Sequence, residues 1–454
     1  MTLPKITTVL PFEDFPVEAD RTWVDWVHDA DDPKKNHLKP EALDDILVLD
    51  VSEGHIGALF GSSILAEFGA DVIRVEPPEG DIARKFSPFG YQIKGTGLGY
   101  LMEGRNKFHI TLNLKKPEGQ EAFRRLAAQA DVIIEAFKPG VMDEWGLSYR
   151  FLREINPRLI YASVYTYGHF GPEAGCGKPD YDIVDQARSG VMAVTGEPVE
   201  EEGPQPWTVP TKEGNWMGWY AGGAWAAFGI LTALHYRQIS GEGQMVDVAP
   251  PDAELRFCDY HIQYYHTVQQ IRGLVGAYDS AVFPYTIIKT KDGYSFIAGF
   301  SDPNWEGLTN IMKNPELRAQ FPTIFDRLNK ANQPIIHREI EKWSVNYTSD
   351  EVLDMVQDYV LNRRGPGIVA TAKMTDIKET FEDEAWWERG VFDKGTDPYY
   401  GDVAFQCPPW KMTLTPARVK WMCRPVGGDN EYIFMKYLGV GKEKLKEWQQ
   451  ANVV

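Results

Sequence analysis

Cysteine is scarce in this sequence, and the few that occur lie far apart. The chain has 454 residues and four cysteines, without a CxxC pair or a His and Cys spacing typical of a metal site. This excludes a disulfide scaffold and predicts reduced thiols in a cytoplasmic protein that holds no metal. No basic stretch followed by an apolar run opens the chain, so an export signal is not expected.

Positive charge is also in short supply. Lys and Arg total 47 against 65 Asp and Glu, which gives a net charge of −18 at pH 7. Such a chain repels phosphate backbones and anionic lipid surfaces, which excludes nucleic acids and membranes as expected partners. One charge-free segment, 216–234, is long enough to cross a bilayer. Its glycines and the soluble pattern around it favour a wholly buried helix instead.

Residues 46–250 alternate between short apolar runs and helical spacing. This alternation predicts a doubly wound, Rossmann-like α/β domain with a parallel sheet, in which ligands bind at the carboxyl ends of the strands. Further on, an Asp-Gly turn at 292–293 and a capping box at 348–351 predict a smaller α+β domain. The expected strands of the large domain are 46–51, 71–76, 108–114, 131–137 and 158–165.

The change in the pattern of predicted strands and helices along the chain predicts a division into four parts. With 43% hydrophobic residues and this length, the chain can form two or three cores. We expect an N-terminal extension at 1–45, the large domain at 46–274, the small domain at 275–390, and a C-terminal segment at 391–454 that returns to the large domain.

Few motifs carry chemistry by themselves. The first βα junction, Ser52–Gly57, contains His55 and Ile56 and lies where a doubly wound sheet binds cofactors. A plain tight turn explains it equally well. Asp180 and Asp182 flank a tyrosine in a polar segment, and there composition favours a solvated turn over an active-site loop. The residues alone therefore identify no reaction.

Six sequence blocks in a fixed order carry a resemblance to known enzymes. They are LDVSEGHIG (49–57), EFGADVIRVEPPEGDIAR (67–84), NKFHITLNLKKPEG (106–119), ADVIIEAFKPGVMDEWGLSYRFLREINPRLIYASV (130–164), YDIVDQARSGVMAVTG (181–196) and GILTALHYRQISGEGQMVDVA (229–249). With them the chain resembles the family III CoA-transferases, which include formyl-CoA transferase and carnitine CoA-transferase. The resemblance is close over about residues 45–300 and looser beyond.

The resemblance implies a fold and a mechanism. Two chains form an interlocked dimer, each with a large α/β domain and a smaller α+β domain, and CoA lies across the large domain as a substrate, with no permanently bound cofactor. An aspartate attacks the acyl-CoA thioester and releases CoA as a mixed anhydride forms. CoA then returns to give an aspartyl thioester, and the acceptor carboxylate takes its turn.

The sequence departs from the family at this central residue. The family aspartate stands ten residues before the glycine that corresponds to Gly229, and here that position is Trp219. An indole has no oxygen that could attack a thioester. The acids that could replace it are Glu213, Asp180 and Asp182.

Several residues that contact CoA in the family are also replaced in this sequence. His55 stands where the family has a glutamine, Ala136 where it often has an asparagine, and Glu144 where an arginine is frequent. Each exchange removes a hydrogen bond or an attraction to phosphate. Lys107 could meet a phosphate or be a plain surface lysine. The full set that the resemblance places along CoA is His55, Ile56, Arg84, Lys107, Ala136, Phe137 and Lys138.

An intact scaffold with a lost nucleophile predicts a non-catalytic subunit. The chain most resembles the aspartate-lacking paralogue of two-subunit transferases of the succinyl-CoA:benzylsuccinate type, which act in anaerobic toluene degradation. That resemblance implies a heterodimer or heterotetramer with a catalytic paralogue that carries the aspartate. Two alternatives stay open: a self-sufficient CoA-transferase or acyl-CoA isomerase that uses another carboxylate, and a CoA-binding regulatory module.

Overall fold

The computed structural model describes residues 22–197, 210–258 and 260–454. Its largest element is a six-stranded parallel sheet in the order β5-β2-β1-β6-β7-β8. The chain starts in the middle at β1, moves to one edge, and returns to build the other, so the predicted doubly wound α/β sheet is confirmed. The strands are β1 (Leu47–Asp50), β2 (Asp71–Glu76), β5 (Lys107–Thr111), β6 (Val132–Glu135), β7 (Ile160–Val164) and β8 (Met245–Val248).

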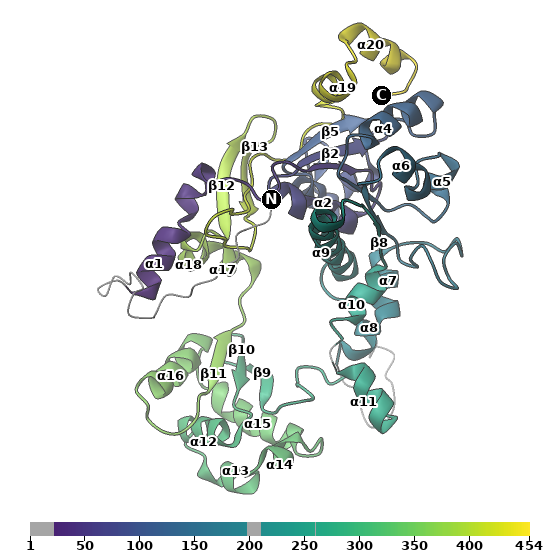
Figure 1. Ribbon diagram of the computed structural model, residues 1–454. Coiled ribbons are helices and arrows are strands. Elements are labelled where there is room, and N and C mark those ends of the chain that lie inside the picture. The colour runs from purple at the N-terminus through teal and green to yellow at the C-terminus, as the bar shows by residue number, and fades with distance from the viewer. Residues whose placement is uncertain (1–21, 198–209, 259) are drawn as a thin grey trace, which may run out of the picture.

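Helices cover both faces of this sheet (Figure 1). On one face, α2 (Ile56–Glu67) and α9 (Met217–Ser240) enclose a core with Val48, Val132 and Ile160. On the other face the core includes helices from both ends of the domain, because side chains near the C-terminus join it. These helices are α4 (Pro117–Ala127), α6 (Tyr149–Ile155), α19 (Asn430–Leu438) and α20 (Lys442–Gln450).

A smaller antiparallel sheet forms a second body with its own core. The predicted Asp-Gly turn is confirmed, and it joins β9 (Tyr285–Lys289) and β10 (Tyr294–Ala298) in a hairpin, to which β11 (Ala370–Lys373) is added on the other edge of β10. The predicted capping box is confirmed at Thr348, which opens a helix over this sheet. Its helices are α12 (Asp302–Ile311), α13 (Pro315–Gln320), α14 (Ile324–Leu328), α15 (Gln333–Ser344) and α16 (Ser349–Leu361).

The remaining elements connect or flank these two bodies. They include the N-terminal helix α1 (Trp23–Ala30) and a hairpin of β12 (Phe392–Asp397) and β13 (Gly401–Gln406), which appear on the same side of the view in Figure 1. The others are the short helices η2 (Pro33–Leu38), η3 (Ile82–Lys85), η4 (Pro88–Gly90), α3 (Leu98–Glu103), α5 (Val141–Glu144), α7 (Asp182–Ser189), α8 (Val191–Val194), α10 (Pro250–Leu255), α11 (His261–Val268), α17 (Ile377–Glu382) and α18 (Glu384–Glu388), and the hairpin of β3 (Gln92–Ile93) and β4 (Thr96–Gly97).

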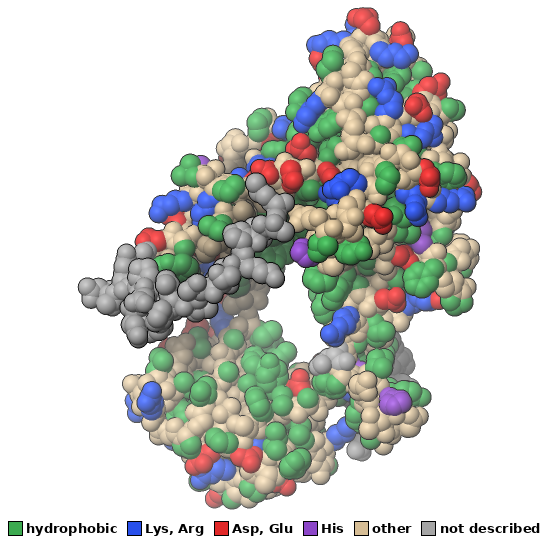
Figure 2. Space-filling view, in the orientation of Figure 1, with side chains coloured by type: hydrophobic (Ala, Val, Ile, Leu, Met, Phe, Trp, Pro, Cys, Tyr) green, Lys and Arg blue, Asp and Glu red, His purple; other side chains and the backbone are tan. Residues whose placement is uncertain are grey.

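An opening separates the body of the large sheet from that of the small sheet in the space-filling view (Figure 2). Hydrophobic side chains border it, which is the kind of surface that a second chain covers. The four-part division and the interlocked dimer nevertheless stay predictions.

The expectation of a wholly buried helix over 216–234 is wrong in one respect. Helix α9 buries one side against α2 and the sheet, yet it exposes Phe228 by 62% and, further along, Ile239 by 74%. Within the described part of the chain these side chains are left uncovered, so the helix is not completely buried although its apolar pattern continues around it. None of the described helices, α9 included, is long and apolar enough to cross a membrane.

Candidate active site

Two glycines hold the start of α9 against α2. A Cβ atom on Gly57 would lie 2.2 Å from the carbonyl oxygen of Trp219, and one on Gly223 would lie 2.0 Å from the carbonyl oxygen of Gly57. Neither position has room for a methyl group, so the two helices approach backbone to backbone. This contact fixes Trp219 beside His55, the residue that caps the N-terminus of α2.

Trp219 is enclosed by other aromatic rings. Its ring centroid lies 4.8 Å from that of His55, 6.3 Å from Phe86 and 6.2 Å from Trp216, and the side chain is only 5% exposed. The indole N–H has no hydrogen-bond partner among the described residues. Nδ1 of His55 accepts the Ala58 N–H at 3.0 Å, and burial lowers the pKa of His55, so the imidazole is neutral at pH 7. This apolar enclosure offers no nucleophilic oxygen.

Two of the predicted substitute acids lie next to this enclosure. Oδ1 of Asp182 accepts the backbone N–H of Trp219 at 3.2 Å, while its Oδ2 accepts the amide of Gln186 at 2.8 Å. Burial raises the pKa of Asp182. Glu213 donates its backbone N–H to the amide oxygen of Gln186 at 2.9 Å, and its pKa is raised by partial burial and by Asp182. Both acids are therefore weaker than ordinary carboxyl groups.

The third predicted acid, Asp180, joins a cluster that the sequence did not reveal. Its Oδ2 lies 3.8 Å from Nε2 of His55, and its Oδ1 accepts the Thr166 hydroxyl at 2.7 Å. Thr166 also lies 2.6 Å from Asp185, whose pKa burial raises to about 8. Glu254 is 1% exposed, and burial raises its pKa to about 7. In the described residues no such group has the arrangement of a metal site.

Replacing Asp185 by asparagine is expected to raise stability at alkaline pH. The pKa of Asp185 is about 8 in the fold against an ordinary value of 3.8, so the folded state keeps a proton that the unfolded chain releases. That contribution is complete below the lower value and is lost as pH rises through the higher one. Asparagine still accepts the Thr166 hydroxyl and carries no charge. We expect the Tm of D185N to exceed that of the wild type by several degrees at about pH 8.5 and to match it at about pH 4.

Thermal unfolding followed by circular dichroism at the two pH values measures this difference. The matched control is D354N, because Asp354 is exposed on α16. A D185N protein with the same Tm difference at both pH values would contradict the expectation.

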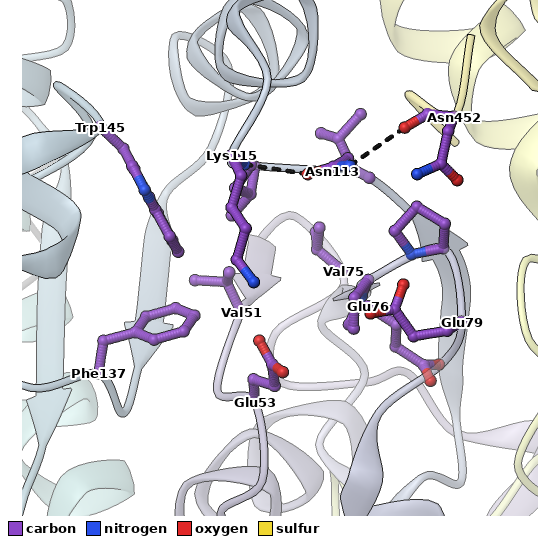
Figure 3. Close-up of a pocket in the computed structure, with 14 residues that line it drawn as sticks. Val51, Glu53, Val75, Glu76, Glu79, Asn113, Lys115, Phe137, Trp145 and Asn452 are labelled. Carbon is purple, nitrogen blue, oxygen red and sulfur yellow. Dashed lines mark hydrogen bonds between the residues drawn. The ribbon is translucent and has the colours of Figure 1, made fainter.

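A pocket of about 160 Å³ lies at the carboxyl ends of β1, β2 and β5. One wall is aromatic: Phe137 and Trp145 meet edge to face with ring centroids 5.2 Å apart (Figure 3). Phe137 is thus the one predicted CoA contact that lines this pocket.

The polar wall of this pocket is dominated by carboxylates. Glu53, Glu76 and Glu79 line it, and the charge of Glu76 is compensated by its ion pair with Arg84. Among the described residues Lys115 is the one cationic side chain of the lining, and it extends toward Glu53 in Figure 3. Excess negative charge opposes the binding of a phosphate group. The pocket is therefore poorly suited to a phosphate group.

Two predicted CoA-binding cations are engaged inside the protein. Nε and Nη2 of Arg84 each lie 2.6 Å from a carboxylate oxygen of Glu76. Nζ of Lys107 donates to the hydroxyl of Ser62 at 2.7 Å and lies 3.5 Å from Asp50, with no exposed surface at all. The alternative of a surface lysine at this position is wrong, because Lys107 is a core residue. Neither side chain faces an open pocket with a free donor group.

The other predicted contacts are spread along the same edge of the sheet. Ile56 is the buried first residue of α2, and Ala136 is half-buried just after β6. Lys138 is exposed, with its ammonium 3.4 Å from the carbonyl oxygen of Gly177. Glu144 is exposed at the end of α5. Of the three predicted cations, only Lys138 is therefore positioned to meet a ligand from solvent, and the assignment of the set to CoA stays a prediction.

Comparison with known proteins decides the family. A family model described as CoA-transferase family III matches residues 43–430. The chain belongs to CoA-transferase family III. A succinyl-CoA:mesaconate CoA-transferase of Haloarcula marismortui is 34% identical over 379 residues, which cover 82% of this chain and 91% of the relative. Relatives in this family transfer CoA between acyl-CoA thioesters and carboxylic acids.

Other family III proteins extend the comparison. The alpha subunit of the succinyl-CoA–L-malate CoA-transferase of Chloroflexus aurantiacus is 30% identical and covers 91% of this chain and 92% of its own length. The beta subunit is 29% identical and covers 88% and 95%. Among solved structures, a CAIB/BAIF family protein from Brucella suis matches with a TM-score of 0.74 and 27% identity over 88% of this chain and 100% of that one. The expected fold is thereby confirmed.

Proposed function

We propose that this chain is the non-catalytic subunit of a heteromeric CoA-transferase that moves CoA from succinyl-CoA to an arylsuccinate such as benzylsuccinate. The observation that carries the proposal is Trp219. The resemblance puts the family nucleophile at this position, where the chain has an indole that packs against His55 and is 5% exposed. A thioester carbonyl brought here meets ring carbons and an N–H, and neither can attack it.

The comparisons support a heteromer of paralogues. The alpha and beta subunits of the Chloroflexus malate enzyme both match this chain at nearly the same identity. A family III transferase can thus be built from two related chains, which leaves room for a chain without the family aspartate. In this proposal a paralogue carries that residue in a heterodimer or heterotetramer.

The comparisons also support succinyl-CoA as the CoA donor, because it is named in these relatives and in the Haloarcula enzyme. The proposed location is the cytoplasm, which agrees with four free cysteines.

The second candidate is a self-sufficient transferase that uses Asp182. This acid is favoured over the other substitutes because its Oδ1 lies 3.2 Å from the backbone nitrogen of Trp219, next to the family position. Its two carboxylate oxygens already accept hydrogen bonds from the Trp219 N–H and the Gln186 amide, which engages the lone pairs that an attack would use. We therefore rank this candidate second.

Covalent labelling separates the two candidates. The chain, purified alone, is incubated with succinyl-CoA, treated with hydroxylamine or borohydride to trap an aspartyl thioester, and measured by intact mass spectrometry. We expect no adduct on this chain and a stoichiometric adduct on an aspartate-bearing family III transferase treated in parallel. An adduct on the isolated chain overturns the proposal, and its loss in D182N would assign the nucleophile to Asp182.

A further inference from the structure

Trp216 links the Trp219 enclosure to a second, much larger cavity. Its ring packs 6.2 Å from that of Trp219, and it also lines a cavity of about 1100 Å³. Helices α2 and α3, the segment before α9, and the chain around α18 and β13 form the walls. The aromatic residues that line it are Phe60, Trp216, Tyr220, Trp386 and Trp410.

The aromatic lining leaves indole surface open to solvent. Trp386 is 43% exposed and Trp410 is 39% exposed, although both line a concave surface. Phe60 and Tyr220, which line the same cavity, meet edge to face with ring centroids 4.8 Å apart. Exposed indoles in a cavity that is also lined by ordered rings are suited to stacking on a flat apolar group.

The charged lining is cationic, in contrast to the chain as a whole. Of the two acids in the lining, Glu67 is paired with Arg105 at 3.0 Å, and burial raises the pKa of Glu103, which accepts the hydroxyl of Tyr220 at 3.2 Å. Arg105 is fully engaged because it also donates to a backbone carbonyl at 2.6 Å. What remains to attract a ligand is therefore positive, in a chain whose net charge is −18.

The available cations are Arg389, Lys411 and Lys212. The guanidinium of Arg389 is exposed and has no hydrogen bond or ion pair within the described residues. Nζ of Lys411 uses one donor, on the carbonyl oxygen of Gly390 at 2.8 Å, and Nζ of Lys212 uses two. A free guanidinium fork is the best single partner for a carboxylate.

Arg389 and Trp386 are neighbours on one helical turn. They are three residues apart at the end of α18, a spacing that places two side chains on one face of a helical turn. A planar apolar ring and a bidentate carboxylate donor thus lie side by side in the lining of the cavity.

We infer that this cavity binds an aromatic carboxylate. The aryl group stacks among Trp386, Trp216 and Tyr220, and the carboxylate is held by Arg389 with Lys411 beside it. The inference rests on the proposed function in one respect, since it names this subunit as a recognition site for the acceptor acid.

Isothermal titration of the full-length chain with benzylsuccinate and with succinate, both without CoA, tests the inference. We expect benzylsuccinate to bind about tenfold more tightly than succinate, and R389Q and W386A each to weaken its binding about tenfold. The matched controls are R338Q and W23A, which change exposed residues outside the cavity and should leave the affinity unchanged.

The inference fails if benzylsuccinate does not bind, if it binds no more tightly than succinate, or if either cavity variant keeps the wild-type affinity. The titration requires neither CoA nor a partner chain. A chain that forms its own succinyl-CoA adduct would therefore overturn the proposed function and leave this binding result intact.

Discussion

Replacing Trp219 by aspartate is expected to leave the isolated chain without transferase activity and to lower its free energy of unfolding by about 3–5 kcal/mol. The change removes an indole that packs on His55, Phe86 and Trp216. It also puts a second carboxylate beside Asp182, which already accepts the N–H of residue 219. Two buried like charges repel each other, and a buried charge without a cation is costly.

Activity is not expected to return with the aspartate, because the nucleophile is only one part of the site. Arg84 is paired with Glu76, and Lys107 is bonded inside the core, so neither is free to hold a phosphate of CoA. The pocket at the end of the sheet adds the charges of Glu53 and Glu79. Without a well-held thioester, a new carboxylate has little to attack.

Urea unfolding and a coupled CoA-transfer assay measure the two effects. W219F is the matched control, since it keeps an aromatic ring against His55 and should lose only about 1–2 kcal/mol. If W219D is as stable as the wild type and has substantial turnover, then the aspartate is the one catalytic feature that this family III site lacks.

The part of the fold that the sequence predicted is the part in which local pattern and tertiary structure agree. The run at 46–51 became β1 because a strand buried on both faces is mostly apolar. The run at 71–76 became β2 although it carries charged residues, because Arg74 and Glu76 are buried in ion pairs. The turn at Asp292 and the cap at Thr348 are set by residues next to them in sequence. The exposed face of α9 was missed because its apolar residues continue around the helix.

Trp219 was the one residue of the candidate site whose place could be predicted from the sequence. Trp219 could be found by counting along a sequence block, whereas its neighbours come from distant segments. Asp185 follows Asp182 at helical spacing, which is a usable signal, but nothing in the local sequence indicates that Glu254 is buried near them. The aromatic cavity joins segments as far apart as Phe60 and Trp410, so only the fold could reveal it.

Replacing Arg74 by leucine is expected to lower the free energy of unfolding by about 3–5 kcal/mol, because it removes one partner of a buried ion pair. Its guanidinium is fully buried, lies 2.6 Å from Asp50, and also pairs with Asp81. Although burial opposes it, Arg74 and Lys107 lower the pKa of Asp50 to about 2. Without the arginine, two carboxylates remain in the core with too little positive charge to compensate them.

The pH dependence of this loss identifies its cause. Because the pKa of Asp50 lies below its ordinary value of 3.8, its contribution to stability is present above that value and is lost as pH falls toward 2. The deficit of R74L in urea unfolding should therefore be largest at neutral pH and shrink in acid. The control is R150Q, since Arg150 pairs with Asp143 at the surface and its loss should cost less than about 1 kcal/mol. If R74L loses no more free energy of unfolding than R150Q, the buried ion pairs of Arg74 do not hold the candidate site in place.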